Sequence, residues 1–243
     1  MRWVRFTETG NESPQFGELI EEEIRTERGA VRLGDVRLLA PCTPTKIVCV
    51  GRNYAAHAAE LGNEVPTRPL LFLKPPSAVI GPDAAIRLPR DAEVHHEAEL
   101  GVVIGRTCRN VPAEQASGVI RGYTCLNDVS DRTAQSWEKN WVRAKAFDTS
   151  APIGPWIVSP DEVNEPLRVV LRVNGEIRQD GRTDAMIFTI PRLIEEITGF
   201  MTLEPGDIIA TGTPDGVGPL VPGDVVEVTI DGVGTLRNPV IKG

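Results

Sequence analysis

The stretch of residues 95–104 constrains the fold more than any other part of this chain. From position 98 onward every second residue is apolar, as on one buried face of a strand, namely Ala98, Leu100, Val102 and Ile104. The opposite face carries Glu97 and Glu99, two carboxylates only two residues apart. Like charges at that separation repel, and each raises the pKa of the other unless a cation lies between them. The stretch therefore predicts a strand whose acidic face is either solvated or bound to a cation.

A third carboxylate follows a second apolar run. Residues 119–126 have the pattern of a strand, and this run ends at Asn127-Asp128. If the two strands are neighbours, Asp128 joins Glu97 and Glu99 in a site made only of oxygen ligands. Such a hard site suits Mg²⁺, Mn²⁺ or Ca²⁺. An exposed sheet face with solvated glutamates is the plainer interpretation of the same pattern.

The composition favours a protein with many short strands. The 243 residues can bury one substantial core, with room for a small appendage. The 20 prolines and 23 glycines indicate tight turns rather than long helices. The net charge of −8 gives no general electrostatic attraction for nucleic acid or for an anionic membrane, so neither is expected as a partner.

The sequence carries no evident signal for export or membrane insertion. No segment approaches the roughly 18 consecutive apolar residues of a membrane span. No apolar secretory segment opens the chain, and no C-x-x-C spacing occurs among its cysteines, which are Cys42, Cys49, Cys108 and Cys125. These features predict a soluble cytoplasmic protein with reduced thiols.

The chain is expected to divide at a proline-rich linker, residues 41–44. Residues 1–44 contain short strand-like pieces and predict a small β appendage, and residues 45–243 predict a catalytic domain. Apolar runs at residues 46–50 and 70–73 have the pattern of buried strands, and Asn174-Gly175 is a strong hairpin signal. Four helices are expected. The first covers residues 55–62 and ends at Gly62, the second starts at Pro112, and the third covers residues 130–137. The fourth covers residues 191–197, with Thr189 as its cap and Gly199 as its stop.

A histidine and a glutamate share one turn of the first expected helix. His57 and Glu60 are spaced i, i+3, which places their side chains on the same face. A carboxylate in that position could orient the imidazole and raise its basicity, as general-base catalysis requires. The alternative is a surface pair with no catalytic role.

Two further features suit an anionic ligand. Lys74 ends an apolar run, where it could meet an anion or simply be solvated. The glycine-rich residues 210–218 would expose backbone N–H groups that could cradle a carboxylate, although a plain β connection would look the same. They do not form a phosphate loop, because neither G-K-[ST] nor G-x-G-x-x-G is present. The chain also lacks H-E-x-x-H, which argues against zinc protease chemistry.

Taken together, these pieces resemble the fumarylacetoacetate hydrolase family. The matching motifs occur in family order across residues 46–240, and they are Gly51-Arg52-Asn53-Tyr54-x-x-His57-x-x-Glu60, Leu73-Lys74-Pro75, Glu97-x-Glu99-Leu100, Asn127-Asp128-Val129-Ser130-x-Arg132-x-x-Gln135, Lys145-Ala146-Phe147-Asp148, Ile190-Pro191-Arg192-Leu193-Ile194 and Thr211-Gly212-Thr213-Pro214-x-Gly216-Val217-Gly218. So many ordered matches over most of the chain are not expected by chance.

The resemblance implies an α+β fold that is mostly β. It would be a mixed, largely antiparallel β-roll or β-sandwich with a small N-terminal β appendage, assembled as a homodimer. The resemblance also implies a divalent metal, Mg²⁺ with Mn²⁺ or Ca²⁺ as alternatives, held by Glu97, Glu99 and Asp128. Substrates in this family are small anionic 2-oxo acids that chelate the metal through the carboxylate and the adjacent oxo group.

The same resemblance implies roles for the residues around the metal. His57 would be the base and Glu60 its partner, while Lys145 and Gln135 would steady developing negative charge. Substrate contacts would come from five residues, Arg52, Asn53, Lys74, Arg132 and Thr213. The family often has Ala-Arg-Asp where this chain has Asp131-Arg132-Thr133, so the polarity beside the arginine differs.

The expected activity is metal-dependent hydrolysis of a C–C bond in acylpyruvate-type 2,4-dioxo acids such as fumarylpyruvate. The family leaves two alternatives open, an isomerase/decarboxylase of the 2-hydroxyhepta-2,4-diene-1,7-dioate type in aromatic catabolism and an oxaloacetate decarboxylase. A protein that binds a metal or a 2-oxo acid without catalysis is a further alternative of a different class. Retention of His57 and Glu60 argues against it, because binding alone needs neither residue.

Overall fold

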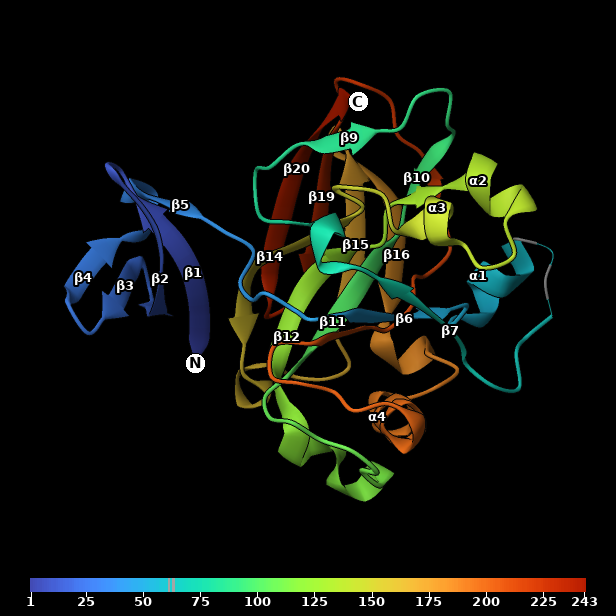
Figure 1. The fold of residues 1–243 in the computed structure, drawn as a ribbon, viewed down its shortest axis with the longest axis horizontal. Helices are drawn as coiled ribbons and strands as arrows, with labels where there is room; N and C mark the ends of the chain where they lie inside the picture. Colours follow the sequence, from blue (N-terminus) through green and yellow to red (C-terminus); the bar gives the residue numbers. More distant parts are fainter. Residues whose placement is uncertain (61, 63) are drawn as a thin grey trace.

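Strands make up most of the regular structure of this protein. A computed structural model describes residues 1–60, 62 and 64–243 of the chain. The strands form three sheets, and short helices lie around them (Figure 1). The mostly β, α+β class that the sequence predicts is confirmed.

The first five strands form a small antiparallel unit at one end of the molecule, at the left of Figure 1. They are β1 (Arg2–Glu8), β2 (Asn11–Ile20), β3 (Glu23–Thr26), β4 (Gly29–Arg32) and β5 (Val36–Leu38). Their buried side chains form a separate small cluster of Val4, Phe6, Leu19 and Ile24. β1 also pairs with β14, where Trp3 lies opposite Ile157, so the unit continues the largest sheet. A domain boundary at residue 44 stays a prediction.

The largest sheet continues through the strands that carry the acidic residues. In spatial order they are β14 (Ala151–Val158), β12 (Ile120–Asn127), β11 (Ala98–Ile104), β17 (Ile208–Ala210), β6 (Ile47–Gly51) and β7 (Leu70–Lys74), with β8 (Val79–Ile80) also paired to β14. β11 and β12 run antiparallel, and Ala98 lies opposite Asn127. This register places the start of β11 beside the end of β12, where the predicted metal ligands lie.

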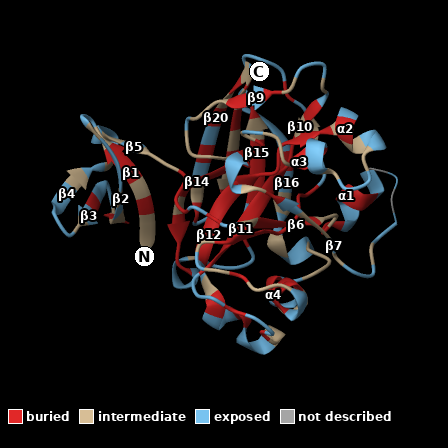
Figure 2. Ribbon diagram, viewed as in Figure 1, coloured by how far each residue is buried: buried red, intermediate tan, exposed pale blue. Residues whose placement is uncertain are grey.

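A second sheet packs against the first. Its strands, in spatial order, are β16 (Glu176–Arg182), β15 (Arg168–Val173), β19 (Val225–Ile230), β20 (Gly234–Lys242) and β9 (Ile86–Leu88). A small third sheet contains β13 (Ser130–Asp131), β10 (Val94–His96) and β18 (Gly218–Pro219). Buried residues gather between the two larger sheets, where the main core lies (Figure 2). The core contains branched apolar side chains such as Leu100, Val102, Leu171 and Val228.

The helices are short and lie at the rim of the sheets. They are α1 (Ala55–Glu60), α2 (Arg132–Trp137), α3 (Val142–Lys145) and α4 (Ile190–Phe200), and 3₁₀ turns cover residues 33–35, 76–78, 113–119, 160–162 and 183–185. The apolar residues of α4 recur at helical spacing and form its buried face, which includes Ile190, Leu193, Ile194 and Ile197. Within the part of the chain that the structure describes, no helix is long and apolar enough to cross a membrane.

The acidic stretch differs from the single strand that its sequence predicts. β10 ends at His96 and β11 begins at Ala98, so the ladder is interrupted at Glu97. The interruption arises because two backbone N–H groups donate to side chains. Glu97 N donates to Asn127 Oδ1 at 2.9 Å, and Ala98 N donates to Gln179 Oε1 at 3.0 Å. The predicted faces are nevertheless present, because Glu97 and the next acidic residue, Glu99, line one cavity while the apolar residues enter the core.

β7 is the last strand of the largest sheet, so the expectation of a buried strand at residues 70–73 is wrong. β7 pairs with β6 alone in that sheet, and Leu70 and Leu73 are 41% and 48% exposed. An apolar run does not distinguish a central strand from an edge strand, because both can be continuous in sequence. The run at residues 46–50 does form a buried strand, β6.

Two predicted turns are confirmed by their backbone conformation. Asn174 and Gly175 connect β15 to β16, and both have positive φ, 53° and 83°, as a two-residue hairpin turn requires. Gly62 follows α1 with φ of 67°, the left-handed conformation in which glycines end helices. Leu61, which the first predicted helix includes, lies outside the described residues.

The other helix ends differ from their predictions by a few residues. Gly199 lies inside α4, which ends at Phe200, so this glycine is not the stop. Thr189 precedes α4, but its side chain makes no cap hydrogen bond. The segment after Pro112 forms a 3₁₀ turn at residues 113–119 rather than an α-helix.

α2 begins two residues later than predicted. The Asp131 side chain accepts a hydrogen bond from Ala134 N at 2.9 Å and so caps the helix, which starts at Arg132. The preceding residues instead form β13, whose pairing with β10 brings this segment to the acidic stretch.

Candidate active site

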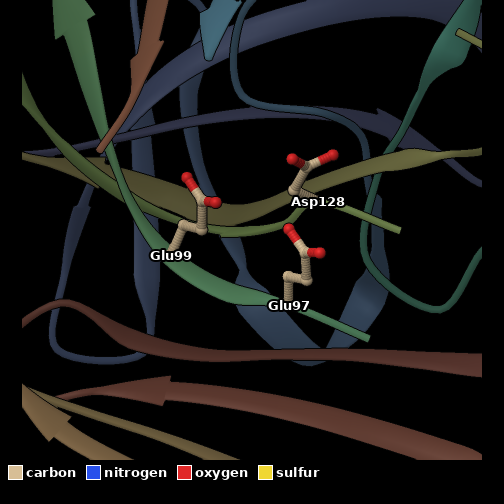
Figure 3. Close-up of side chains that lie close together, drawn as sticks. All are labelled: Glu97, Glu99 and Asp128. Carbon is tan, nitrogen blue, oxygen red and sulfur yellow. The ribbon is translucent and has the colours of Figure 1, made fainter. Parts of the chain in front are cut away.

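Three carboxylates converge where β11 and β12 meet, and they point toward a common space (Figure 3). Glu97 lies at the break before β11, Glu99 lies on β11, and Asp128 directly follows β12. Each offers a carboxylate oxygen, and these oxygens lie within 4.8 Å of one another. All three residues are buried, so the plainer interpretation of a solvated acidic face is wrong.

Burial and two negative neighbours act together on Glu99. Removal from water raises the pKa of its carboxyl group, and the nearby Asp128 and Glu97 raise it further. The N–H of Gly212 donates to Glu99 Oε2 at 2.8 Å, which opposes the rise only in part. The pKa of Glu99 therefore lies well above its ordinary value, and a cation bound at this site would restore the ionised form.

Glu97 is also buried, but two cationic side chains outweigh the effect of burial. Burial raises the pKa of its carboxyl group, whereas Lys145 and Arg132 lower that pKa to below its ordinary range. Lys145 Nζ donates to Glu97 Oε2 at 2.9 Å, and Arg132 Nη2 lies 2.6 Å from Glu97 Oε1. Glu97 is therefore ionised at neutral pH.

Two lysines balance the charge of Asp128. Lys145 Nζ donates to Asp128 Oδ2 at 2.7 Å, and Lys74 Nζ lies 2.8 Å from Asp128 Oδ1. Burial lowers the pKa of Lys145, but Asp128 and Glu97 raise it above its ordinary value. Charges removed from water are tolerated only when opposite charges lie close by. Here Glu97 and Asp128 each contact cationic side chains directly, and Glu99 lies beside these two acids.

The carboxylate cluster fits a hard divalent cation. Its donor atoms are all carboxylate oxygens, which Mg²⁺ and Mn²⁺ prefer. Asp128 Oδ1 accepts no well-directed hydrogen bond among the described residues, although the Lys74 ammonium group lies close to it. A buried oxygen of this kind, beside an acid with a raised pKa, is a ready metal ligand. Glu97, Glu99 and Asp128 are thus the residues that would hold the ion.

The carboxylates line a cavity of about 480 Å³. Its other walls carry cationic, polar and aromatic side chains, including Arg52, His57, Phe72, Arg132, Gln135, Trp141, Lys145 and Thr213. The rings of Phe72 and Trp141 meet edge to face with centroids 5.5 Å apart, and Lys145 Nζ lies 4.9 Å from the Phe72 centroid. The cavity therefore combines an acidic cluster with cationic and aromatic walls.

The histidine of the α1 pair lines this cavity, and its partner Glu60 lies at the surface. His57 Nδ1 lies 3.1 Å from Glu60 Oε2, as the i, i+3 spacing predicts. His57 is only 4% exposed and lines the cavity, so the histidine itself is not a surface residue, whereas the catalytic role of the pair stays a prediction. Because Nδ1 is engaged by the carboxylate, Nε2 is the ring nitrogen left for a ligand or a water molecule.

Arg132 and Gln135 lie on α2 and interact with each other. Arg132 Nη1 donates to Gln135 Oε1 at 2.7 Å, which leaves the amide N–H groups of Gln135 as donors toward a ligand. The unusual neighbour Asp131 faces away from this pair, because its carboxylate caps α2. The departure from the family pattern beside Arg132 therefore leaves the arginine free to contact Glu97.

Lys74 and Asn53, which were expected to contact substrate, do not line the cavity. Lys74 is fully buried and donates to three backbone carbonyl oxygens in addition to its contact with Asp128, namely those of Val129, Lys145 and Ser150. Asn53 is also fully buried, and its amide bonds to the backbone of Thr211 and Phe188. Both residues hold the loops of the site in place through backbone hydrogen bonds, and neither lines the cavity wall.

Gln179 and His96 belong to the surroundings of the site and are not predicted from the sequence. His96 Nδ1 lies 3.1 Å from Gln179 Oε1, and burial lowers the pKa of His96 to about 4, so the imidazole is neutral at neutral pH. Gln179 also contacts Thr213 of the cavity wall, through Nε2 at 2.8 Å. No local pattern marks Gln179, because its partners come from segments far away along the chain.

The fold and the cavity define a mostly β enzyme whose buried carboxylates can hold a divalent metal beside a histidine–glutamate pair. The family of fumarylacetoacetate (FAA) hydrolase C-terminal domains matches residues 46–241. This chain therefore belongs to the fumarylacetoacetate hydrolase family, as its motifs predict.

Relatives and solved structures agree with this assignment. Protein Rv2993c of Mycobacterium tuberculosis is 53% identical over 213 residues, which cover 86% of this chain and 80% of that protein. A 5-carboxymethyl-2-hydroxymuconate delta-isomerase from Mycobacterium smegmatis is 44% identical, with a TM-score of 0.91 over 100% of this chain and 99% of the other. A maleylpyruvate hydrolase from Sphingobium sp. SYK-6, in complex with manganese(II) and pyruvate, is 36% identical, with a TM-score of 0.83 over 100% of both chains. Known activities among similar proteins thus include hydrolysis and isomerisation.

Proposed function

We propose that this protein hydrolyses a C–C bond in acylpyruvate-type 2,4-dioxo acids, such as fumarylpyruvate, with the help of a divalent metal. The observation that carries the proposal is that His57, paired with Glu60, lines the same cavity as the three carboxylates. A binding protein would need the carboxylates but not the pair. The maleylpyruvate hydrolase from Sphingobium supports a substrate of this class.

In this proposal the carboxylates of Glu97, Glu99 and Asp128 would hold Mg²⁺ or Mn²⁺, and the cation would supply Lewis-acid chemistry at the substrate. Around that position the chain adds its own donors. Lys145 and the amide of Gln135 stabilise the negative charge that develops on the oxo oxygens. Thr213 contacts the substrate carboxylate, and Arg52 and Arg132 add positive charge to the cavity wall.

His57 activates the water that attacks the substrate. Nε2 takes a proton from water while the water oxygen bonds to the distal acyl carbonyl carbon, and Glu60 stabilises the imidazolium that forms. The bond between that carbon and the pyruvate methylene then breaks, and its electron pair remains on the pyruvate fragment as an enolate. Return of the proton from His57 to the methylene carbon yields pyruvate and the free acid, which balances the reaction.

Isomerisation or decarboxylation of a dienoic diacid is the second candidate. The similarity to the isomerase from M. smegmatis favours it, with 44% identity over the whole chain. In that reaction His57 would move a proton between carbon atoms and no water would be consumed. Oxaloacetate decarboxylation is a third possibility within the same site, because it also leaves an enolate of a 2-oxo acid.

A substrate panel separates these activities. Purified protein with Mg²⁺ or Mn²⁺ would be incubated with fumarylpyruvate, maleylpyruvate, oxaloacetate and 2-hydroxyhepta-2,4-diene-1,7-dioate, and products would be identified by NMR. Release of pyruvate from an acylpyruvate supports the proposal. Turnover of only the dienoic diacid supports the isomerase instead. Binding of oxalate with no turnover of any compound supports a protein that binds 2-oxo acids without catalysis.

We also propose that the protein acts in the cytoplasm as a homodimer. Exposed apolar side chains support an association surface, since Leu70 and Leu73 on β7 and Trp137 and Val142 near α2 and α3 are all more than 40% exposed. Free and buried cysteines are compatible with a reducing compartment. Light scattering after gel filtration tests the dimer, which a monomeric mass at micromolar concentration would exclude.

A further inference from the structure

Gln179 stands out on β16 because it is the buried residue of an otherwise accessible strand. The other six residues of β16 are exposed or partly exposed, whereas Gln179 is 1% exposed. A polar side chain in such a position is unfavourable unless its hydrogen-bonding groups are satisfied. Gln179 points from the second sheet toward the acidic stretch, so its partners are residues of the active site.

All the hydrogen-bonding capacity of the Gln179 amide is used. Its Oε1 faces Ala98 N at 3.0 Å and His96 Nδ1 at 3.1 Å. Its Nε2 faces Pro214 O at 2.8 Å and Thr213 Oγ1 at 2.8 Å. One amide therefore joins the residue between Glu97 and Glu99 to the loop that carries Thr213.

The orientation of this amide is fixed by two backbone partners, one of which can only donate a hydrogen bond and one of which can only accept one. A backbone N–H can only donate, so the atom that faces Ala98 N must be the carbonyl oxygen. A backbone carbonyl can only accept, so the atom that faces Pro214 O must be the NH₂ group. A flipped amide would place like groups against each other at both ends, and the assignment of Oε1 and Nε2 follows from the contacts themselves.

This orientation determines what the Thr213 hydroxyl group can do. Because Gln179 Nε2 donates to Thr213 Oγ1, the hydroxyl oxygen is an acceptor in that bond, and its own hydrogen atom has no acceptor among the described residues. Thr213 lines the cavity of the three carboxylates. The free hydrogen atom can therefore be donated to an anionic group of a ligand in the cavity.

Close packing against β16 restricts the conformation of the loop around Thr213. A Cβ atom added at Gly181 of β16 would collide with the ring of Pro214, and one added at Gly216 would collide with the backbone of Arg178. Gly216 also has a positive φ of 89°, which side chains rarely adopt. The loop is thus packed closely on β16, and the Gln179 amide meets Thr213 at a defined position.

We propose that Gln179 is a positioning residue that keeps the Thr213 hydroxyl group a donor toward the carboxylate of a bound 2-oxo acid. The proposal rests on the proposed function, because it takes that acid as the ligand. Gln179 does not itself line the cavity, so it acts through Thr213. A carboxylate at position 179 would reverse the direction of the hydrogen bond, because it can only accept from the Thr213 hydroxyl group. The hydroxyl hydrogen would then no longer be available to the ligand.

The test is a double-mutant cycle with Mn²⁺ and oxalate as probes. Wild-type protein, Gln179→Glu, Thr213→Val and the double variant would be titrated with Mn²⁺, and then with oxalate at saturating Mn²⁺, by calorimetry. Gln179→Met, which removes the amide without adding charge, is a second variant in case Gln179→Glu does not fold. Ile177→Ala is the matched control, because Ile177 is an exposed residue of the same strand.

The expected result is a loss of oxalate affinity that depends on Thr213. Gln179→Glu and Thr213→Val should each weaken oxalate binding by about tenfold or more, the value of a hydrogen bond to a charged group. Gln179→Met adds no charge, so in the Thr213→Val background it should cause no further loss of oxalate affinity. Mn²⁺ affinity should be nearly unchanged in Gln179→Met and Thr213→Val, and Ile177→Ala should match the wild type.

Three results would overturn the proposal, and they can be told apart. Losses that multiply when Gln179→Met is combined with Thr213→Val would mean that Gln179 acts independently of Thr213, which leaves the proposed function intact. A wild-type protein that binds Mn²⁺ but not oxalate would refute the proposed function and this inference together. Unchanged oxalate affinity in both Gln179 variants would refute the positioning role directly.

Discussion

The backbone N–H of Gly216 donates to Glu60 Oε1 at 3.0 Å, although 156 positions separate the two residues. The other carboxylate oxygen of Glu60 is paired with His57, so the glutamate is held from both sides. The same loop donates to Glu99 through Gly212 N. One loop thus fixes the histidine–glutamate pair relative to the carboxylate cluster.

Replacing His57 by alanine should separate catalysis from binding. Because His57 Nε2 is the proposed base and the carboxylates hold the metal, kcat for an acylpyruvate should fall by roughly 10²-fold or more. Mn²⁺ and oxalate affinities should stay nearly unchanged. Glu60→Gln should lower kcat less than His57→Ala does, because an amide can still form a hydrogen bond to the imidazole but does not stabilise its cation. Hydrolysis by His57→Ala at the wild-type rate would exclude His57 as the base.

Replacing Glu99 by glutamine should remove metal binding and leave the fold intact. In the wild type, Mn²⁺ at about 100 times its Kd should stabilise the protein by about 2.7 kcal/mol, seen as a rise in Tm. Glu99→Gln should lose most of this rise, because one of the three carboxylates is gone. Chelation should abolish activity, and Mg²⁺ or Mn²⁺ should restore it. Glu114→Gln, at an exposed acid outside the cavity, is the control. An equal Mn²⁺-dependent rise in Glu99→Gln would contradict the ligand assignment.

Lys74 and Arg52 should respond in opposite ways to replacement by methionine. Lys74→Met leaves three backbone carbonyl groups without their donor and removes one of the two cations beside the buried Asp128, so the free energy of unfolding should fall by about 3 kcal/mol or more. Arg52→Met should change stability by less than about 1 kcal/mol and instead weaken ligand binding, because Arg52 lines the cavity. Urea unfolding and oxalate titration measure the two effects. A stable Lys74→Met that loses oxalate binding would restore the role of Lys74 as a substrate contact.

The contribution of Asp207 to stability should depend on pH. Burial raises the pKa of Asp207, but hydrogen bonds from Lys46, Glu204 N and Thr45 outweigh it and lower the pKa below the ordinary value. A carboxyl group with a lowered folded-state pKa contributes stability fully above its unfolded-state pKa of about 3.9, and the contribution is lost as the pH falls through the folded-state pKa.

Asp207→Asn should therefore be less stable than the wild type at pH 7, by about 1–3 kcal/mol. The difference should narrow below about pH 4, where the wild-type carboxylate begins to take up a proton. Urea unfolding of both proteins between pH 3 and pH 7 measures the difference. A gap that stays constant over this range would mean that the charge of Asp207 is not the source of its effect.

The carboxylate cluster could be predicted because its signals are local. Alternation placed Glu97 and Glu99 on one face, and the end of the next strand supplied Asp128, so only the pairing of two neighbouring strands had to be assumed. The i, i+3 spacing of His57 and Glu60 is local in the same sense. Short strands between prolines and glycines likewise indicated the mostly β class.

Features that depend on distant partners could not be predicted in this way. Lys74 has the appearance of a strand-end cation, and only the folding of residues 129–150 over it makes it a buried donor. Gln179 lies on an accessible strand, and its burial depends on a loop 34 residues further along. The break at Glu97 depends on the side chain of Asn127, 30 residues away.

The pairing of β1 with β14 gives the first residues of the chain a protective role. Arg2 and Trp3 lie opposite Val158 and Ile157, and β14 is followed in the sheet by β12, the strand that leads to Asp128. Loss of β1 would leave backbone N–H and C=O groups of β14 open to another chain, and such open edges promote aggregation. A truncation that removes β1 should therefore raise the tendency to aggregate more than a change confined to the strands β2 to β5, which do not pair with β14.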